Sequence, residues 1–142
     1  MLTTHLLHPE ILSALASAGH GARVLLADGN YPFSTGAPAG ARRVYLNLRP
    51  GLVSVTDTLE AVVSAIPIEM AMVMVPPDGS EPEIHRAMRV LLPRDTGFEQ
   101  RGRFEFYAEA RSADTTLVIA TGEQRVFANI LLVIGVVKPR TA

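Results

Sequence analysis

The sequence contains no cysteine among its 142 residues. Without a thiol, the chain forms neither a disulfide nor a thiolate metal site, and it has no cysteine nucleophile. Lysine is almost missing as well, because Lys138 is the one lysine among the 13 basic residues. A catalytic Schiff base would depend on that single residue near the C-terminus, so this chemistry is a poor prediction.

Charge of either sign is scarce. Charged residues make up 19% of the chain and hydrophobic residues 48%, whereas an average soluble domain has about 25% charged residues. The 13 basic and 14 acidic residues nearly cancel, and the net charge is -1. This balance argues against a protein held to nucleic acid or to a membrane surface by charge. We therefore expect no nucleic-acid or membrane partner.

Long hydrophobic runs are missing too. The longest apolar stretch, residues 126–137, is interrupted by Asn129 and Gly135. It falls far short of the roughly 20 residues that cross a bilayer. The first 12 residues have no basic start and do not resemble a secretory signal, so we expect a cytoplasmic protein. The length suits a single domain, residues 1–142, whose core needs no disulfide.

Predicted strands and helices alternate along the chain. Apolar or alternating stretches predict strands over residues 23–27, 43–48, 70–75, 115–120 and 129–134. Helical spacing predicts one helix that starts at Pro9 and stops before Gly19, and others over residues 56–66, 81–92 and 104–111, with Thr56 as a capping residue. This order predicts an α/β fold, a three-layer domain with a central mixed sheet flanked by helices. Residues 28–41 are predicted to form a loop, and loops of this length often carry function.

The standard motifs of phosphate, dinucleotide and hydrolase sites are missing. The sequence has no phosphate-binding loop, no dinucleotide-binding glycine fingerprint and no nucleophile elbow. His5 and His8 are three residues apart near the terminus, and we interpret them as exposed polar residues in preference to metal ligands. His85 falls in a predicted amphipathic helix and is expected on the surface. No metal site is predicted.

Two residues flank the predicted strand over residues 23–27. His20 lies between two glycines before this strand, and Asp28 follows its last residue. Ligands of open α/β sheets bind beyond the carboxyl ends of strands, which is where Asp28 lies. Because the strand spans roughly 17–20 Å, the two side chains meet only if the histidine loop folds over or if two subunits join there. The alternative interpretations are that His20 caps the preceding helix and that Asp28 starts a turn.

Four separated blocks of the sequence carry a family resemblance. They are Gly19-His20-Gly21 with residues 23–32, then residues 103–107, then Thr121-Gly122-Glu123, and finally residues 129–135. In this order they resemble the ribose pyranase and fucose mutarotase family, RbsD/FucU, over nearly the whole chain. The resemblance implies an α/β domain that assembles into a decameric ring, with each site near a subunit contact. It also implies an isomerase without cofactor or metal that interconverts anomers or ring forms of a monosaccharide.

The resemblance assigns the family's catalytic histidine to His20 and its sugar-binding aspartate to Asp28. A histidine suits ring opening because its ordinary pKa of about 6.5 lets it give and take protons near neutrality. A carboxylate such as that of Asp28 accepts hydrogen bonds from sugar hydroxyls or orients the imidazole. The implied chemistry is therefore acid and base catalysis of ring opening and reclosure.

The remaining implied substrate-binding residues are Arg103, Phe127, Ala128 and Asn129. Arg103 matches an arginine of the fucose branch, and Asn129 matches a sugar-contacting asparagine, so the resemblance is closer to L-fucose mutarotase. Phe127 departs from the family, which usually has tyrosine there, and a phenolic hydroxyl is lost while the ring can still stack on a sugar. A second departure, Ala108-Glu109-Ala110 in place of Glu-Arg-Ala, removes a charge pair.

Three alternatives remain beside the fucose mutarotase prediction. One is a ribose-type pyranase, and another is a non-catalytic monosaccharide-binding accessory of sugar uptake, to which Phe127 points. The third is an enzyme of another class, such as a lyase or a hydrolase. That third class would need a nucleophile or a metal for which the sequence offers no candidate.

Overall fold

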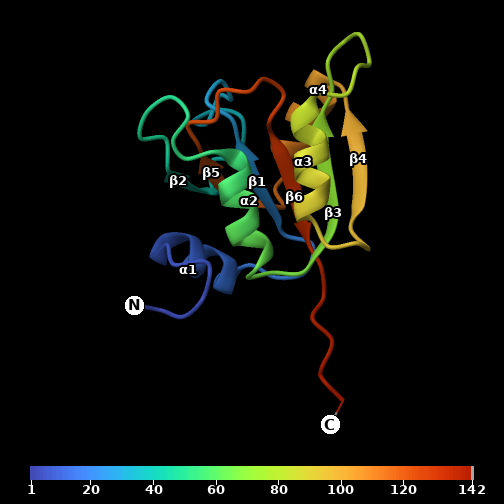
Figure 1. The fold of residues 1–142 in the computed structure, drawn as a ribbon. Coiled ribbons are helices and arrows are strands. Elements are labelled where there is room, and N and C mark those ends of the chain that lie inside the picture. The colour runs from blue at the N-terminus through green and yellow to red at the C-terminus, as the bar shows by residue number, and fades with distance from the viewer. Residues whose placement is uncertain (142) are drawn as a thin grey trace.

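One sheet with helices on both faces forms the protein in a computed structural model, which describes residues 1–141 (Figure 1). The strands are β1 (Arg23–Ala27), β2 (Arg42–Tyr45), β3 (Ile68–Met74), β4 (Gly97–Arg101), β5 (Thr115–Ala120) and β6 (Ile130–Ile134). The helices are α1 (Pro9–Ser17), α2 (Val55–Val63), α3 (Glu83–Leu91) and α4 (Arg103–Ala110). The predicted α/β fold is thereby confirmed.

The sheet is mixed, and its strand order is β2-β5-β1-β6-β3-β4. Strand β6 runs antiparallel to its neighbours β1 and β3, while the β1–β5, β2–β5 and β3–β4 pairs are parallel. All strands except β6 therefore end at the same edge of the sheet, where β6 begins. We call this edge the carboxyl edge and the opposite one the amino edge.

Side chains of the strands pack alternately into a core on each face. Val24 and Leu26 of β1 belong to the core that α1, α2 and α3 cover. Leu25 belongs to the other core, where Phe106 of α4 and Tyr31 of the 28–41 loop pack against the sheet. Because both faces are covered, β1 is a continuous apolar run and not an alternating one. The predicted three layers are confirmed.

Local hydrogen bonds set the helix starts. His8 caps α1, because its Nδ1 accepts a hydrogen bond from Ile11 N at 3.4 Å. Ser54 caps α2, because its Oγ accepts from Asp57 N at 3.0 Å, so Thr56, the predicted cap, lies inside the first turn. Within residues 1–141, no helix is both long and apolar enough to cross a membrane. Nor do three or more His, Asp or Glu side chains of this range gather in an arrangement that could hold a metal ion.

Two features around α3 differ from the prediction. Strand β4 pairs with β3 from Met70 to Met74, but its own sequence, Gly-Phe-Glu-Gln-Arg, lacks the apolar pattern of a covered strand. An edge strand needs no such pattern, which explains why it was missed. The prediction that His85 lies on the surface is wrong, since this residue is 0% exposed. Its ring packs edge-on against Phe98 of β4, the strand that the sequence did not reveal.

Candidate functional site

Four of the predicted site residues line one cavity at the carboxyl edge. This cavity, which we call the Asp28 cavity, has a volume of about 180 Å³ and is lined by Asp28, Arg103, Phe127 and Asn129 among others. Asp28 follows β1, Arg103 starts α4 just after β4, and the other two residues precede β6. The carboxyl edge thus gathers residues that are far apart in the sequence, as expected for open α/β sheets.

The carboxyl group of Asp28 is buried and held in place. The residue is 3% exposed. Its Oδ1 accepts a hydrogen bond from Asn30 N at 3.0 Å, and its Oδ2 accepts one from Ala128 N at 3.3 Å. Burial raises the pKa of Asp28 above its ordinary value, although the backbone hydrogen bonds act in the opposite direction. Asp28 therefore starts the turn, as one interpretation predicted, and also presents a carboxyl group to the cavity.

Asn129 is tied to the same turn. Its Oδ1 accepts a hydrogen bond from Asp28 N at 2.8 Å, and the residue is buried. With the oxygen engaged, the NH₂ group of this amide is the part that can donate to a ligand in the cavity. Acceptors from Asp28 and a donor from Asn129 therefore stand side by side, a pairing that suits a ligand with neighbouring hydroxyl groups.

Phe127 adopts an unusual backbone conformation. Its φ is 56°, in the left-handed region that residues other than glycine rarely occupy. The residue lines the Asp28 cavity, and the next peptide N–H, that of Ala128, points to the Asp28 carboxylate. The turn at residues 127–129 thus joins an aromatic wall of the cavity to its acidic group.

Several lining residues were not predicted from the sequence. They are Asn30, Tyr31, Met74, Tyr107 and Val126. Tyr31 donates its hydroxyl to Gly36 O at 2.7 Å, and burial raises the pKa of that hydroxyl above its ordinary value. Tyr107 packs edge-on against Tyr31 with ring centroids 5.6 Å apart. Two signals were available: Met74 ends a strand at the carboxyl edge, and Tyr107 follows Arg103 by four residues, hence on the same helix face.

His20 lies at the opposite, amino edge. It follows α1, and the N–H of the next residue, Gly21, donates to Ile134 O at the end of β6 at 2.9 Å. The imidazole is 57% exposed, and its Nε2 lies 3.0 Å from Glu69 Oε2. The C-cap of α1 is Ala18, so the helix-capping interpretation of His20 is not supported. Within one chain, β1 separates His20 from Asp28, in agreement with the length of that strand.

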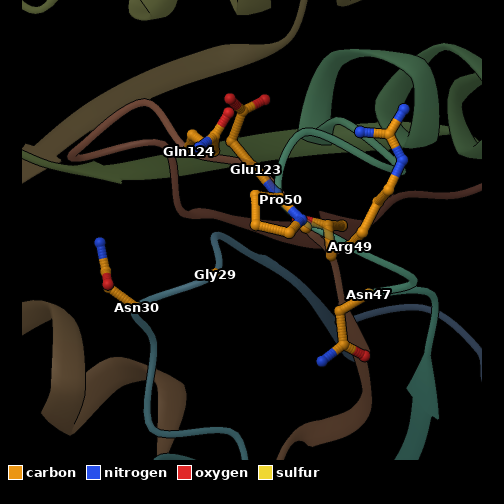
Figure 2. A pocket seen from close by; sticks show the side chains of 9 residues that line it. Gly29, Asn30, Asn47, Arg49, Pro50, Glu123 and Gln124 are labelled. Carbon is orange, nitrogen blue, oxygen red and sulfur yellow. The ribbon is translucent and has the colours of Figure 1, made fainter.

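A second and larger cavity lies on the same edge, and Figure 2 shows the side chains that line it. Its volume is about 400 Å³, and Asn30 lines both cavities. Thr121 Oγ1 donates to Ala27 O at 2.7 Å, and Gly29 N donates to Glu123 O at 2.9 Å. The Thr121–Glu123 segment, which forms one wall of this larger cavity, therefore holds the turn that carries Asp28.

Glu123 joins this turn to the start of α2. The residue is buried, and its Oε2 accepts a hydrogen bond from Val55 N at 3.1 Å. Its Oε1 accepts from Arg125 Nε at 2.9 Å, and the same guanidinium also reaches Oε2 at 2.8 Å. The Arg125 hydrogen bonds, the largest of these effects, lower the pKa of Glu123 to about 2. A charged carboxylate at this place therefore stabilises both the turn and the helix start.

We expect Glu123→Gln to lower the free energy of unfolding by on the order of 1–3 kcal/mol at neutral pH. The folded-state pKa lies below the ordinary value, so the stabilisation by the carboxylate is complete above pH 4.5 and is lost as the pH falls toward 2. The difference between wild type and variant should therefore shrink on acidification. Urea unfolding at a series of pH values measures it, and a difference independent of pH would contradict this role.

Comparisons with known proteins identify the family of the chain. A family model described as the RbsD / FucU transport protein family matches residues 1–137. A bovine protein named fucose mutarotase is 34% identical over 148 residues, which cover 95% of this chain and 92% of that protein. A protein of Variovorax paradoxus named D-ribose pyranase is 33% identical, with coverage of 96% of this chain and 98% of its own length.

A solved structure has the same fold. Bacillus subtilis RbsD in complex with D-ribose matches with a TM-score of 0.83 at 26% identity, covering 97% of this chain and 100% of that one. The agreement of family model, relatives and fold confirms the resemblance carried by the four sequence blocks. The chain belongs to the RbsD/FucU family.

Proposed function

We propose that the protein is a monosaccharide mutarotase, an isomerase that interconverts the α and β anomers of a sugar such as L-fucose. The observation that carries this proposal is the Asp28 cavity, in which Asp28, Arg103 and Asn129 converge. Relatives named for fucose and for ribose match nearly the whole chain, and both names describe the opening and reclosure of a sugar hemiacetal. The substrate is therefore a free monosaccharide.

The reaction moves only protons and one C–O bond. The anomeric hydroxyl loses its proton as the C1 carbonyl forms, and the ring oxygen takes a proton as its bond to C1 breaks. Rotation about the C1–C2 bond followed by the reverse steps gives the other anomer. Asp28 accepts hydrogen bonds from sugar hydroxyls, and Asn129 donates one. Arg103, which is exposed at the mouth of the cavity, donates to neighbouring oxygens.

His20 supplies the proton-transfer group, and it comes from a neighbouring subunit. Its exposed imidazole lies at the amino edge, whereas the Asp28 cavity lies at the carboxyl edge. Contacts between the amino edge of one subunit and the carboxyl edge of the next are heterologous, and such contacts form a ring when the rotation between neighbouring subunits closes. The assembly that we propose is the decameric ring implied by the family resemblance.

Exposed apolar side chains at the cavity mouth support this assembly. Phe104 is 81% exposed beside Arg103, and Val126, which lines the cavity, is exposed as well. Large apolar side chains left in water beside a binding cavity are typical of a surface that another chain covers. A covering subunit would bury them and would bring its own His20 to the sugar.

We expect Phe104→Glu to weaken the assembly and to reduce exchange activity in proportion to the loss of assembled chains. The wild-type chain should elute as a species several times its mass of 15.3 kDa, and the variant as smaller species, because a buried unpaired charge opposes association. Light scattering after gel filtration measures the masses. Val90→Glu is the control, since Val90 is 84% exposed on α3, on the other face of the sheet. An F104E variant with the wild-type mass would contradict the proposed interface.

A ribose-type pyranase is the second candidate function. The relative named D-ribose pyranase is about as similar as the one named fucose mutarotase, and the matched solved structure contains D-ribose. A binding protein without activity is a further candidate function, because Phe127 lacks the hydroxyl of the tyrosine usual in the family.

Exchange spectroscopy by NMR separates these candidates. The anomeric protons of L-fucose, D-ribose and D-galactose are followed with a small amount of protein. Faster exchange between the α and β forms of fucose supports the mutarotase, and faster exchange between pyranose and furanose forms of ribose supports the pyranase. Exchange rates equal to those in buffer for every sugar would refute both enzyme functions and leave the binding protein as the remaining candidate.

A further inference from the structure

One buried titratable residue has no part in the chemistry described so far. His85 lies in α3 with 0% exposure. Its Nε2 is 2.9 Å from the carbonyl oxygen of Phe127, while its Nδ1 is buried without a hydrogen-bond partner in the described chain. This imidazole therefore reaches from a helix of the core to the turn that lines the Asp28 cavity.

The protonation state of His85 follows from these contacts. A carbonyl oxygen only accepts hydrogen bonds, so Nε2 carries a proton and donates it to Phe127 O. A proton on Nδ1 would place a second N–H donor in the interior without an acceptor, which is unfavourable. Burial also lowers the pKa of His85 below its ordinary value. The ring is therefore neutral, with its proton on Nε2.

The carbonyl that His85 binds belongs to the peptide group between Phe127 and Ala128. The N–H at the other end of this same peptide group donates to Asp28 Oδ2 at 3.3 Å. A planar peptide bond transmits orientation rigidly, so fixing its C=O also fixes the direction of its N–H. Hydrogen bonds in such a chain also polarise one another. His85 and Asp28 are thus connected through one rigid group.

This peptide group is also the one that needs support. Phe127 has a φ of 56°, a conformation that is unfavourable for a residue with a side chain. Such a conformation persists only where neighbouring contacts hold it. The hydrogen bond from His85 is such a contact, and it acts on the residue whose ring lines the cavity.

We propose that His85 is a positioning residue of the sugar site, acting through the Phe127–Ala128 peptide group on the Asp28 carboxylate and the Phe127 ring. This inference rests on the proposed mutarotase function. It assigns a role to the histidine that touches neither the cavity nor the sugar, and it makes α3 a support of the site. The role requires an N–H donor to Phe127 O at this position and does not require an imidazole that titrates.

The test compares His85→Gln with His85→Met. Glutamine keeps an N–H donor at similar reach, whereas methionine fills the space without one. We expect H85M to lose about tenfold in kcat/KM for fucose exchange, as is typical when a group that orients a site residue is removed, and H85Q to keep most of the activity. Ile84→Val, a buried change in the same helix, controls for a general loss of stability. Equal activity of H85M and wild type, or an H85Q variant as impaired as H85M, would overturn the proposal.

A measurement without substrate keeps this inference separate from the proposed function. Nitrogen-15 NMR of the histidine rings should show His85 neutral and protonated on Nε2. The Ala128 amide proton should shift to higher field in H85M, because its hydrogen bond to Asp28 weakens, and should stay in place in I84V. A charged or Nδ1-protonated ring, or an unmoved Ala128 signal, would overturn the positioning role. A wild-type protein without exchange activity would refute the mutarotase function instead.

Discussion

Replacement of His20 by alanine is expected to lower catalysed anomer exchange by about 10²–10⁴-fold, the usual contribution of a positioned proton-transfer group. The fold should not change, because the imidazole is largely exposed and its one hydrogen-bond partner within residues 1–141 is Glu69 at 3.0 Å. Ion pairs of this exposed kind contribute little to stability. The variant thus separates chemistry from folding.

The measurement is NMR exchange on L-fucose, together with a melting curve for each protein. His5→Ala is the matched control, because His5 is another exposed histidine and lies outside the proposed site. Glu69→Gln tests the partner of His20 and should cost less than H20A, since the imidazole remains. Full activity of H20A would remove His20 from the mechanism.

Replacement of Asp28 by asparagine is expected to reduce exchange by about 10²-fold, as loss of a charged hydrogen-bond acceptor does. Asparagine can still accept the hydrogen bond from Asn30 N. Its NH₂ group, however, would face Ala128 N–H, so a donor meets a donor. The carboxylate oxygens that we assign to sugar hydroxyls are then no longer both available.

The pH dependence of exchange activity in the wild type also tests the role of the Asp28 carboxylate. Burial raises the pKa of Asp28, so the carboxylate is lost on acidification at a higher pH than for an exposed aspartate. Exchange activity of the wild type should fall in that range, and D28N should lack the part of this fall that comes from the Asp28 carboxyl. A raised folded-state pKa also means that the protonated form contributes stability at low pH, and that this contribution is lost as the pH rises. A D28N variant with wild-type activity and the same acid limb would contradict the role of the carboxylate.

The fold was predictable where burial of a strand on both faces produces a simple apolar pattern in the sequence. Strands β1 and β5 are covered on both faces, and each is a short apolar run with the bounds that the sequence predicts. Strand β4 is an edge strand with polar residues, and no local pattern marks it. The error at His85 has the same origin, because Phe98, which packs against the ring, belongs to that strand.

The site was predictable in part, through the resemblance. The resemblance names Asp28 and Asn129, and the structure brings Asn129 Oδ1 within hydrogen-bond distance of Asp28 N, while their role in sugar binding stays a prediction. Met74 and Tyr107 were missed because their place at the cavity depends on strand order, which periodicity does not reveal. The separation of His20 from Asp28 was predicted from the length of β1 alone. That the two side chains act together is our proposal, and it depends on an assembly of subunits and not on a single chain.

Mixing the two inactive variants tests the shared site most directly. H20A and D28N chains are co-expressed in equal amounts, and NMR exchange on L-fucose is compared with the wild type and with each variant alone. If each site takes His20 from one subunit and Asp28 from the next, a random ring rebuilds about a quarter of the sites and about a quarter of the wild-type activity. Mixed assemblies of the wild-type mass that remain as inactive as the separate variants would contradict the account.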